Sequence, residues 1–207
     1  MTTIRIALVA ALVAVAGNAA AQDAGHAQQN YLHLRLGGIL AQSSDLKDTD
    51  IENGFDGEVA IGRRFGPNFA AELGVGYFSA EGSTSSVFDP GSGLTIDITP
   101  KFSGIPITAS AKGIMPLGPS AEVYGLVGLG LYRVTLEATG SALGQTASTS
   151  DDDSAFGFLI GGGISFDVTP KVFLSADLRY LVAKATFFGA EGNIDSLFLN
   201  AGIGTRF

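Results

Sequence analysis

The sequence contains no cysteine and no tryptophan, only two histidines, and few charged residues. Lysine, arginine, aspartate and glutamate make up 15% of the 207 residues, whereas a soluble domain usually carries about 25%. This low charge content indicates that a large part of the folded surface does not face water. Without cysteine the chain can form no disulfide, so its fold must be stabilised in another way.

Long hydrophobic runs are also missing beyond the N-terminus. Hydrophobic residues make up 46% of the chain, yet no later segment approaches the ~18–20 consecutive apolar residues that a membrane-spanning helix needs. The hydrophobicity is instead distributed by alternation, which is typical of β-strands with two different faces. The formal net charge of −8 argues against nucleic acid as a partner, since nucleic-acid binding requires a basic surface.

The N-terminus has the pattern of a secretory signal peptide over residues 1–21. Arg5 precedes an apolar core at residues 6–16, and Ala19, Ala20 and Ala21 form a small-residue cleavage pattern before Gln22. The core is too short to span a bilayer. A retained N-terminal anchor is the alternative. We expect residues 22–30 to be a short lead-in to the folded domain at residues 31–207.

From Tyr31 onward, apolar residues alternate with polar or small residues in eight successive segments. The pattern is clearest at the end of the chain, where Leu199 and Ile203 share one face and Asn200 and Arg206 share the other. The expected strands are residues 31–40, 55–65, 68–79, a segment ending near 115, 121–136, 156–168, 171–187 and 196–207. Pro100 and Pro106 blur the start of the fourth strand, because proline favours sheet edges and bends.

The connections between these strands alternate in length. Short turns are expected at residues 66–68, 116–119 and 169–170, and long polar loops at 41–54, 80–93, 138–154 and 189–195. This alternation, with an even strand number, is typical of bacterial outer-membrane barrels, whose short turns are periplasmic and long loops extracellular. The sequence therefore predicts an all-β fold, an eight-stranded antiparallel up-and-down transmembrane β-barrel with both termini on the periplasmic side.

The polar face of the strands is expected to line the barrel interior. A soluble lipocalin-like barrel is the alternative, with its apolar face inside. In a membrane, each arginine or lysine turned toward the lipid midplane would cost ~2–4 kcal/mol, so the charged face must point inward. The predicted polar network of the lumen consists of Arg35, Glu58, Arg64, Glu72, Lys112, Asp177, Arg179 and Arg206. The intervening glycines would make room for these long side chains.

The final strand, from Asn200 to Phe207, resembles that of the OmpA/OmpX-like family of outer-membrane β-barrels, with OmpW-type barrels as a close variant. Two further stretches resemble the family, at residues 105–108 and 166–172. The resemblance implies that Asn200, Gly202 and Phe207 belong to a C-terminal signal read by the barrel-assembly machinery, although Thr205 stands where a hydrophobic residue is usual. It also implies a cleaved signal peptide and residence in the outer membrane of a Gram-negative bacterium.

No catalytic, cofactor or metal site is expected. His33 falls on the lumen face, where packing is a simpler role than catalysis, and the sequence brings no serine near it. Asp151, Asp152 and Asp153 lack the glycine and glutamate spacing of a calcium loop, so we interpret them as part of a solvated outer loop. Pairs such as Gly128 and Gly130 lie within strands, which excludes a nucleotide-binding glycine loop.

Three functions remain open. The first is a structural and surface-interaction barrel without enzymatic activity, which presents its loops to ligands or to host surfaces. The second is a narrow porin-like channel for small or hydrophobic solutes, and the third, more remote, is an outer-membrane lipid hydrolase. The expected partners are outer-membrane lipid and lipopolysaccharide, with the barrel-assembly machinery during biogenesis, and the barrel is expected to be a monomer. A lumen filled by paired charges favours the first function.

Overall fold

The computed structural model describes residues 29–42, 51–89, 91, 94–142, 145–187 and 189–207. The signal peptide expected at residues 1–21 and most of the expected lead-in lie outside the described residues. Every regular element in the described ranges is a strand. These ranges contain no helix that is long and apolar enough to cross a membrane.

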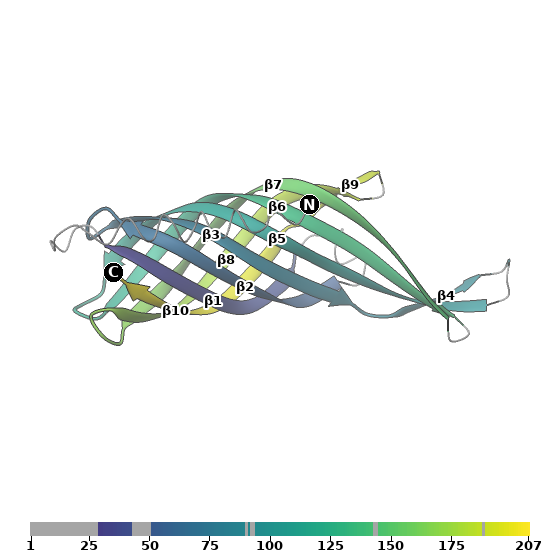
Figure 1. Cartoon of the computed structure of the whole chain (residues 1–207), viewed down its shortest axis with the longest axis horizontal. Helices are drawn as coiled ribbons and strands as arrows, with labels where there is room; N and C mark the ends of the chain where they lie inside the picture. The colour runs from purple at the N-terminus through teal and green to yellow at the C-terminus, as the bar shows by residue number, and fades with distance from the viewer. Residues whose placement is uncertain (1–28, 43–50, 90, 92–93, 143–144, 188) are drawn as a thin grey trace.

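The strands wrap into one closed antiparallel barrel (Figure 1). They are β1 (Asn30–Ala41), β2 (Ile51–Arg64), β3 (Phe69–Gly82), β4 (Ser85–Asp89), β5 (Leu94–Pro116), β6 (Ala121–Ala142), β7 (Gln145–Asp167), β8 (Val172–Phe187), β9 (Ala190–Asn193) and β10 (Ser196–Arg206). Each strand of the ring pairs with its neighbour in sequence, and β10 pairs with both β8 and β1 to close the cylinder. The short strands β4 and β9 lie outside the ring. The predicted eight-stranded up-and-down barrel is thus confirmed.

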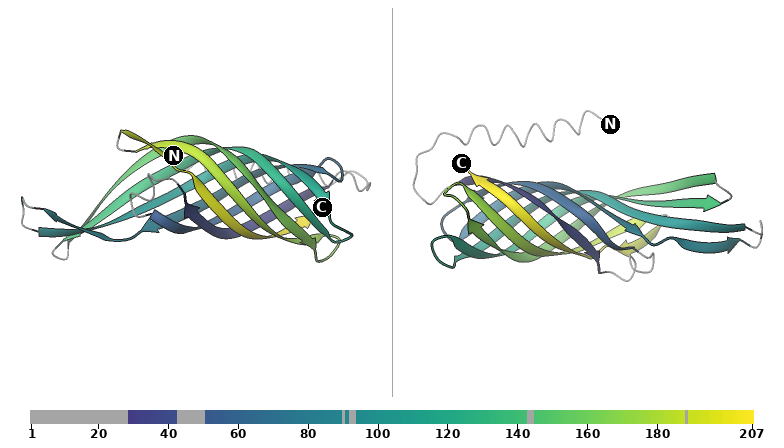
Figure 2. Two further views of the ribbon diagram at one scale, coloured as in Figure 1. Left: turned by 180° about the vertical axis from the view of Figure 1, so that it is seen from behind. Right: turned by 90° about the horizontal axis from the view of Figure 1, so that it is seen from below.

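Three short connections lie at the same end of the barrel as the C-terminus (Figure 2). The turn after β2 contains Gly66 at φ +126° and the turn after β5 contains Gly118 at φ +137°. Both values lie in a region that glycine adopts without steric cost. In the turn after β7, the Thr169 hydroxyl accepts hydrogen bonds from the backbone N–H groups of Lys171 and Val172. These tight turns fix adjacent strands in register at this end.

At the opposite end, segments that we expected to be loops continue as strands. Instead of a loop at 138–154, β6 and β7 stay paired up to Ala142 and Gln145. Strand β4 lies inside the expected loop 80–93 and pairs with the start of β5. Strand β9 lies inside the expected loop 189–195 and pairs with the end of β8. Beyond the membrane both faces of a hairpin meet water, so a strand there needs no apolar alternation. The expected loop 41–54 lies largely outside the described residues.

Pro100 and Pro106 do not interrupt β5, contrary to the expectation of an edge or bend. Pro100 lies beyond the last residue pair of the β3–β5 ladder and pairs only with Ala138 of β6. At Pro106 the β3–β5 ladder skips its pairs between Val75↔Ile107 and Phe78↔Gly104 and then resumes in the same register. The missing N–H of Pro106 is therefore accommodated by a local gap in one ladder.

The outward face forms an apolar band of limited height. On β6 the outward positions are apolar or glycine over residues 123–131, and on β8 they are apolar over residues 172–182, with exposed Leu129, Leu131, Leu174 and Leu178 among them. These lengths match the ~9–11 residues of a tilted membrane strand. The exposed apolar positions and the buried charged positions alternate as predicted from the sequence.

Charged pairs replace the apolar residues at the outer edge of this band. Glu81 pairs with Lys101 at 3.1 Å, Asp152 with Arg133 at 3.5 Å, and Glu191 with Lys184 at 2.8 Å. The hydrogen bond from the Thr135 hydroxyl lowers the pKa of Asp152, and the Glu191 carboxylate raises the pKa of Lys184. These residues mark the outer limit of the apolar band.

Candidate functional site: the barrel interior

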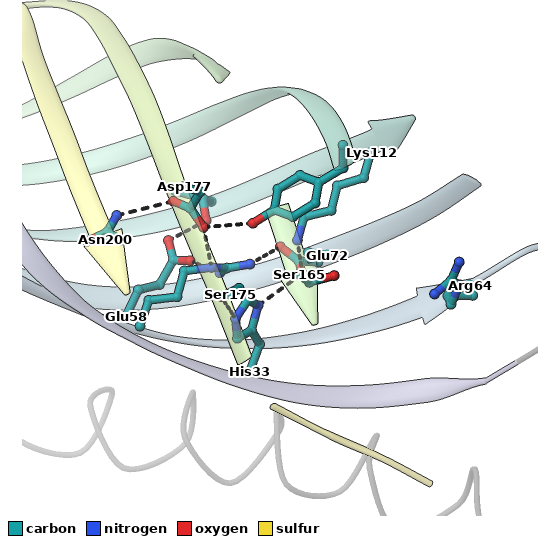
Figure 3. A network of polar contacts seen from close by, with 12 residues as sticks. His33, Glu58, Arg64, Glu72, Lys112, Ser165, Ser175, Asp177 and Asn200 are labelled. Atoms are coloured by element: carbon teal, nitrogen blue, oxygen red, sulfur yellow. Dashed lines mark hydrogen bonds and ion pairs between the residues drawn. The ribbon is translucent and has the colours of Figure 1, made fainter. Parts of the chain in front are cut away.

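The centre of the lumen is occupied by the guanidinium group of Arg35, whose side chain is fully buried. Figure 3 shows three of the carboxylates in this region, those of Glu58, Glu72 and Asp177. The Arg35 Nη2 atom lies 2.6 Å from Glu72 and its Nε atom 3.3 Å from Asp177, and Nη1 contacts Glu58. The four residues come from β1, β2, β3 and β8, which lie on the side of the ring where β10 joins β8 to β1. One arginine therefore links strands from opposite ends of the sequence.

Two more cations complete this central cluster. Lys112 lies 2.6 Å from Glu72, and Arg179 lies 3.0 Å from Glu58 and 2.8 Å from Asp177. The Lys112 ammonium group also lies over the ring of Tyr124, 4.4 Å from its centroid. Three cations thus face three carboxylates, which is the condition under which buried ionised groups are tolerated.

The other two residues of the predicted lumen network lie apart, at the mouth near the short turns. Arg64 contacts Glu122 at 2.9 Å, and Ser165 donates to the same carboxylate. Arg206 pairs with Asp167 at 2.6 Å and lies over the ring of Phe173. The structure therefore places all eight predicted residues on the interior wall but divides them into one central cluster and two pairs at the mouth.

Several polar residues of the interior face were not included in the predicted network. The Tyr124 hydroxyl donates to Asp177 at 3.0 Å, and Asn200 lies between Asp177 and Asp56. With its amide nitrogen turned toward Asp56, Asn200 donates to both carboxylate oxygens at 3.0 and 3.1 Å. Their position on the polar face was visible in the alternation, but the cross-barrel neighbours depend on the stagger of the strands.

His33 has a serine partner, which corrects the expectation that no serine lies near it. Its Nε2 atom and the Ser175 hydroxyl share a hydrogen bond of 2.8 Å, and its Nδ1 atom lies 3.7 Å from Glu72. Serine, histidine and a carboxylate are the residue types of a hydrolase triad. Here Glu72 is also bound by Arg35 and Lys112, and the cavity beside His33 holds about 20 Å³, room for about one water molecule. This packing argues against a lipid substrate.

The outer third of the lumen is apolar, which the prediction of a polar network did not include. Phe78 and Phe102 are 1% exposed, and their ring centroids lie 5.3 Å apart. Phe198 and Phe187 contact this pair edge-on, at 6.3 and 6.2 Å. Val134, Leu181, Ala183 and Ile39 are buried members of the same hydrophobic cluster. The bore is thus filled by charge pairs in its inner part and by aromatic packing in its outer part.

Interior glycines make room mainly for aromatic rings. A Cβ atom added at Gly62 would collide with the ring of Tyr31, and one at Gly204 would collide with the ring of Phe173. At fewer positions a glycine leaves space for a charged side chain, as Gly74 does for Glu58. A lumen of eight strands is just wide enough to be filled by side chains, so these glycines allow the larger ones to fit.

Gly202 offers a direct test of this packing. A Cβ atom there would lie 2.6 Å from both His33 Nε2 and Ser175 Oγ and 2.9 Å from the Leu34 carbonyl oxygen. Gly202→Ala is therefore expected to destabilise the barrel by about 1–3 kcal/mol, as overpacking does. Urea unfolding followed by circular dichroism measures the change. Gly113→Ala is the control, because no heavy atom lies within 4 Å of its added Cβ; equal effects of the two changes would contradict the packing.

The three residues of the expected assembly signal have separate positions in the finished barrel. Asn200 faces the lumen, Gly202 lies beside His33 and Ser175, and Phe207 is exposed at the end of the chain. The Phe207 N–H donates to the Asn30 carbonyl at 2.9 Å, and the Asn30 N–H donates to the Phe207 carbonyl at 3.2 Å. These residues therefore also contribute to packing and to closure of the barrel.

No group of three or more histidine, cysteine, aspartate or glutamate residues suited to a metal ion occurs in the described part of the chain. Asp151, Asp152 and Asp153 lie along β7, where successive side chains point to opposite faces. Asp152 accepts from Thr135 at 2.6 Å, and Asp153 accepts from the backbone N–H of Thr186. The acidic run is thus part of a strand, where we had expected a loop.

A closed antiparallel cylinder with an apolar outer band and a charged interior is the architecture of a transmembrane β-barrel. The chain belongs to the outer membrane protein beta-barrel domain family, whose model matches residues 7–207. This family match confirms the resemblance to OmpA/OmpX-like barrels and the expected location in the outer membrane.

Solved structures show the same fold. Neisserial surface protein A is 22% identical, with 86% of this chain and 97% of that chain covered at a TM-score of 0.53. A major outer membrane protein from Thermus thermophilus is 15% identical, with 88% and 100% covered at a TM-score of 0.55. A comparison with curated protein sequences finds no significant match.

Proposed function

We propose that the protein is a non-conducting outer-membrane barrel with a structural and surface-interaction role and no enzymatic activity. The observation that carries this proposal is the filling of the bore. A neutral cluster around Arg35 occupies its centre, and a cluster around Phe78 and Phe102 occupies its outer part. Two interior cavities that border these clusters in the described part of the chain have volumes of only about 20 and 30 Å³.

The outer hairpins supply the interaction surface in this proposal. Strands β4 to β7 continue beyond the apolar band as a projecting ribbon (Figures 1 and 2). Its described residues are rich in serine, threonine and acidic side chains, including Asp97, Glu137 and Asp151. Such a surface is suited to polar or cationic partners. We also propose that lipopolysaccharide phosphates approach it through divalent cations, because direct contact would be repulsive.

Planar-bilayer recordings test whether the bore conducts. The purified barrel is expected to give no discrete channels, because the Phe78 and Phe102 rings exclude water from its outer part. Phe78→Ala combined with Phe102→Ala removes these rings and is expected to increase ion leak while Arg35 keeps the inner part narrow. Phe156→Ala combined with Phe158→Ala is the control, since both rings are exposed on the outer wall. Large, reproducible channels from the unmodified barrel would support the porin-like alternative and overturn the proposal.

A further inference from the structure

The outward wall of the barrel carries a hollow that is not part of the lumen. It has a volume of about 810 Å³, within the ~300–1,000 Å³ typical of ligand sites. The hollow extends from Asn30 of β1 across β2, β3, β5 and β6 to Phe158 of β7, mainly in the half of the barrel nearer the short turns. It therefore opens toward the hydrocarbon of the membrane.

Small side chains create the depth of this hollow. Ala71 of β3 pairs in register with Ala111 of β5, and Ala109 lies on the same outward face. The surrounding positions carry larger apolar groups, which form the walls. These walls are Ile61, Leu73, Val127, Leu129 and Phe158. The result is an apolar recess bordered by larger apolar side chains.

One end of the hollow is polar. Arg63 of β2 and Asn30 of β1 are paired in register there, and both line the recess. Arg63 is exposed on the outward face, one residue before the end of β2, and its guanidinium lies 5.8 Å from the Phe65 ring centroid. An outward cation is costly at the lipid midplane but nearly neutral at the interface. Arg63 therefore lies at the depth of the lipid headgroups.

We propose that this hollow binds one phospholipid of the periplasmic leaflet. An acyl chain lies along Ala71, Ala109 and Ala111, and the phosphate is held by Arg63 with Asn30 beside it. A guanidinium group offers two parallel donors that match phosphate oxygens. An amphipathic recess, apolar along its length and cationic at the interface end, matches the chemistry of a phospholipid from chain to headgroup.

Two other occupants fit less well. A second copy of the barrel would place two Arg63 side chains near each other at a symmetric interface. Lipopolysaccharide carries phosphate, but the hollow lies in the half of the barrel nearer the short turns, which are periplasmic in this architecture. The geometry thus favours a lipid of the periplasmic leaflet, and the experiment below separates the three.

Native mass spectrometry of the detergent-solubilised barrel, titrated with phosphatidylglycerol, tests the proposal. A one-lipid adduct is expected. Ala71→Leu combined with Ala111→Leu fills the recess and should weaken the adduct about tenfold or more, equivalent to about 1.4 kcal/mol. Arg63→Gln should weaken phosphatidylglycerol binding but leave the weaker binding of a diacylglycerol with the same chains unchanged, because the latter has no phosphate.

Matched controls separate this site from general lipid adhesion. Ala176→Leu combined with Ala201→Leu adds the same bulk at two register-paired outward alanines on β8 and β10, and Lys171→Gln removes a cation from the turn at the same end. Both should bind like the unmodified barrel. Equal binding by all variants would overturn the proposal, as would a dimer that only Ala71→Leu with Ala111→Leu dissociates. Displacement of phosphatidylglycerol by equimolar lipid A would overturn the choice of lipid.

Discussion

Replacing Arg35 with methionine is expected to destabilise the folded barrel by about 3–5 kcal/mol, the range for removing one partner of a buried ion pair. The substitution leaves Glu58, Glu72 and Asp177 facing one another with only Lys112 and Arg179 to compensate. The loss should exceed that of any other single change in the central cluster, because Arg35 alone contacts all three carboxylates. Denaturant unfolding in lipid vesicles, followed by circular dichroism, measures it, since the chain has no tryptophan for fluorescence.

A second substitution identifies the cause of this loss. If uncompensated negative charge destabilises Arg35→Met, adding Glu58→Gln should restore part of the stability, because it removes one of the two carboxylates that must then share Arg179. Lys184→Met is the surface control. Its pair with Glu191 is largely exposed, so the unfolding midpoint should not change. Loss of the same stability in both variants, or no rescue by Glu58→Gln, would contradict a neutral central cluster.

Placing a cation on the lipid-facing wall should have the second-largest effect. Leu178 lies on the outward face of β8, between Lys171 and Lys184 at the two edges of the apolar band. Leu178→Arg is expected to cost about 2–4 kcal/mol, the range measured for arginine near the bilayer midplane. Equilibrium unfolding from vesicles gives this value directly.

Leu117→Arg is the depth control for that experiment. Leu117 is exposed in the turn after β5, where an arginine should cost only about 0–1 kcal/mol, as at other interfacial positions. A similar cost at Leu178 and Leu117 would mean that the outward face is not embedded in hydrocarbon at Leu178. A low cost at both positions would support the soluble-barrel alternative.

The strand architecture could be predicted from the sequence because a membrane barrel has a simple alternation rule. Each lipid-facing position must be apolar, so Leu197, Leu199 and Ile203 identify the face, and Arg206 on the opposite face confirms it. The rule stops applying outside the bilayer. This is why β6 and β7 extend through a segment of serine, threonine and aspartate that we expected to be a loop.

The contacts inside the lumen were only partly predictable. Alternation assigns Arg35 and Asp177 to the interior, but the stagger of the strands decides that they meet, although they lie far apart in sequence. The same applies to Ser175 and His33, whose hydrogen bond was not expected. The apolar cluster was missed for another reason. Phe78 and Phe198 lie on the face that was expected to be polar, and we did not consider that apolar side chains on this face could also fill the bore.

The hollow on the outer wall shows a limit of reading each strand separately. Ala71, Ala109 and Ala111 fit the lipid-facing pattern and carry no signal individually. Their significance comes from register, which places them next to one another on two paired strands and brings Arg63 to the end of the recess. A recess of this kind would let the barrel select a neighbouring lipid while its bore stays closed.

The central claim is that apolar side chains face acyl chains while charged side chains neutralise one another inside a filled bore. Spin labels at Leu199 and Asn200, adjacent on β10 and pointing to opposite sides, test it most directly in lipid vesicles. The label at Leu199 should be relaxed strongly by oxygen dissolved in the hydrocarbon, and the label at Asn200 should be shielded from both oxygen and a water-soluble nickel reagent. Strong oxygen relaxation at Asn200 with shielding at Leu199 would contradict the account.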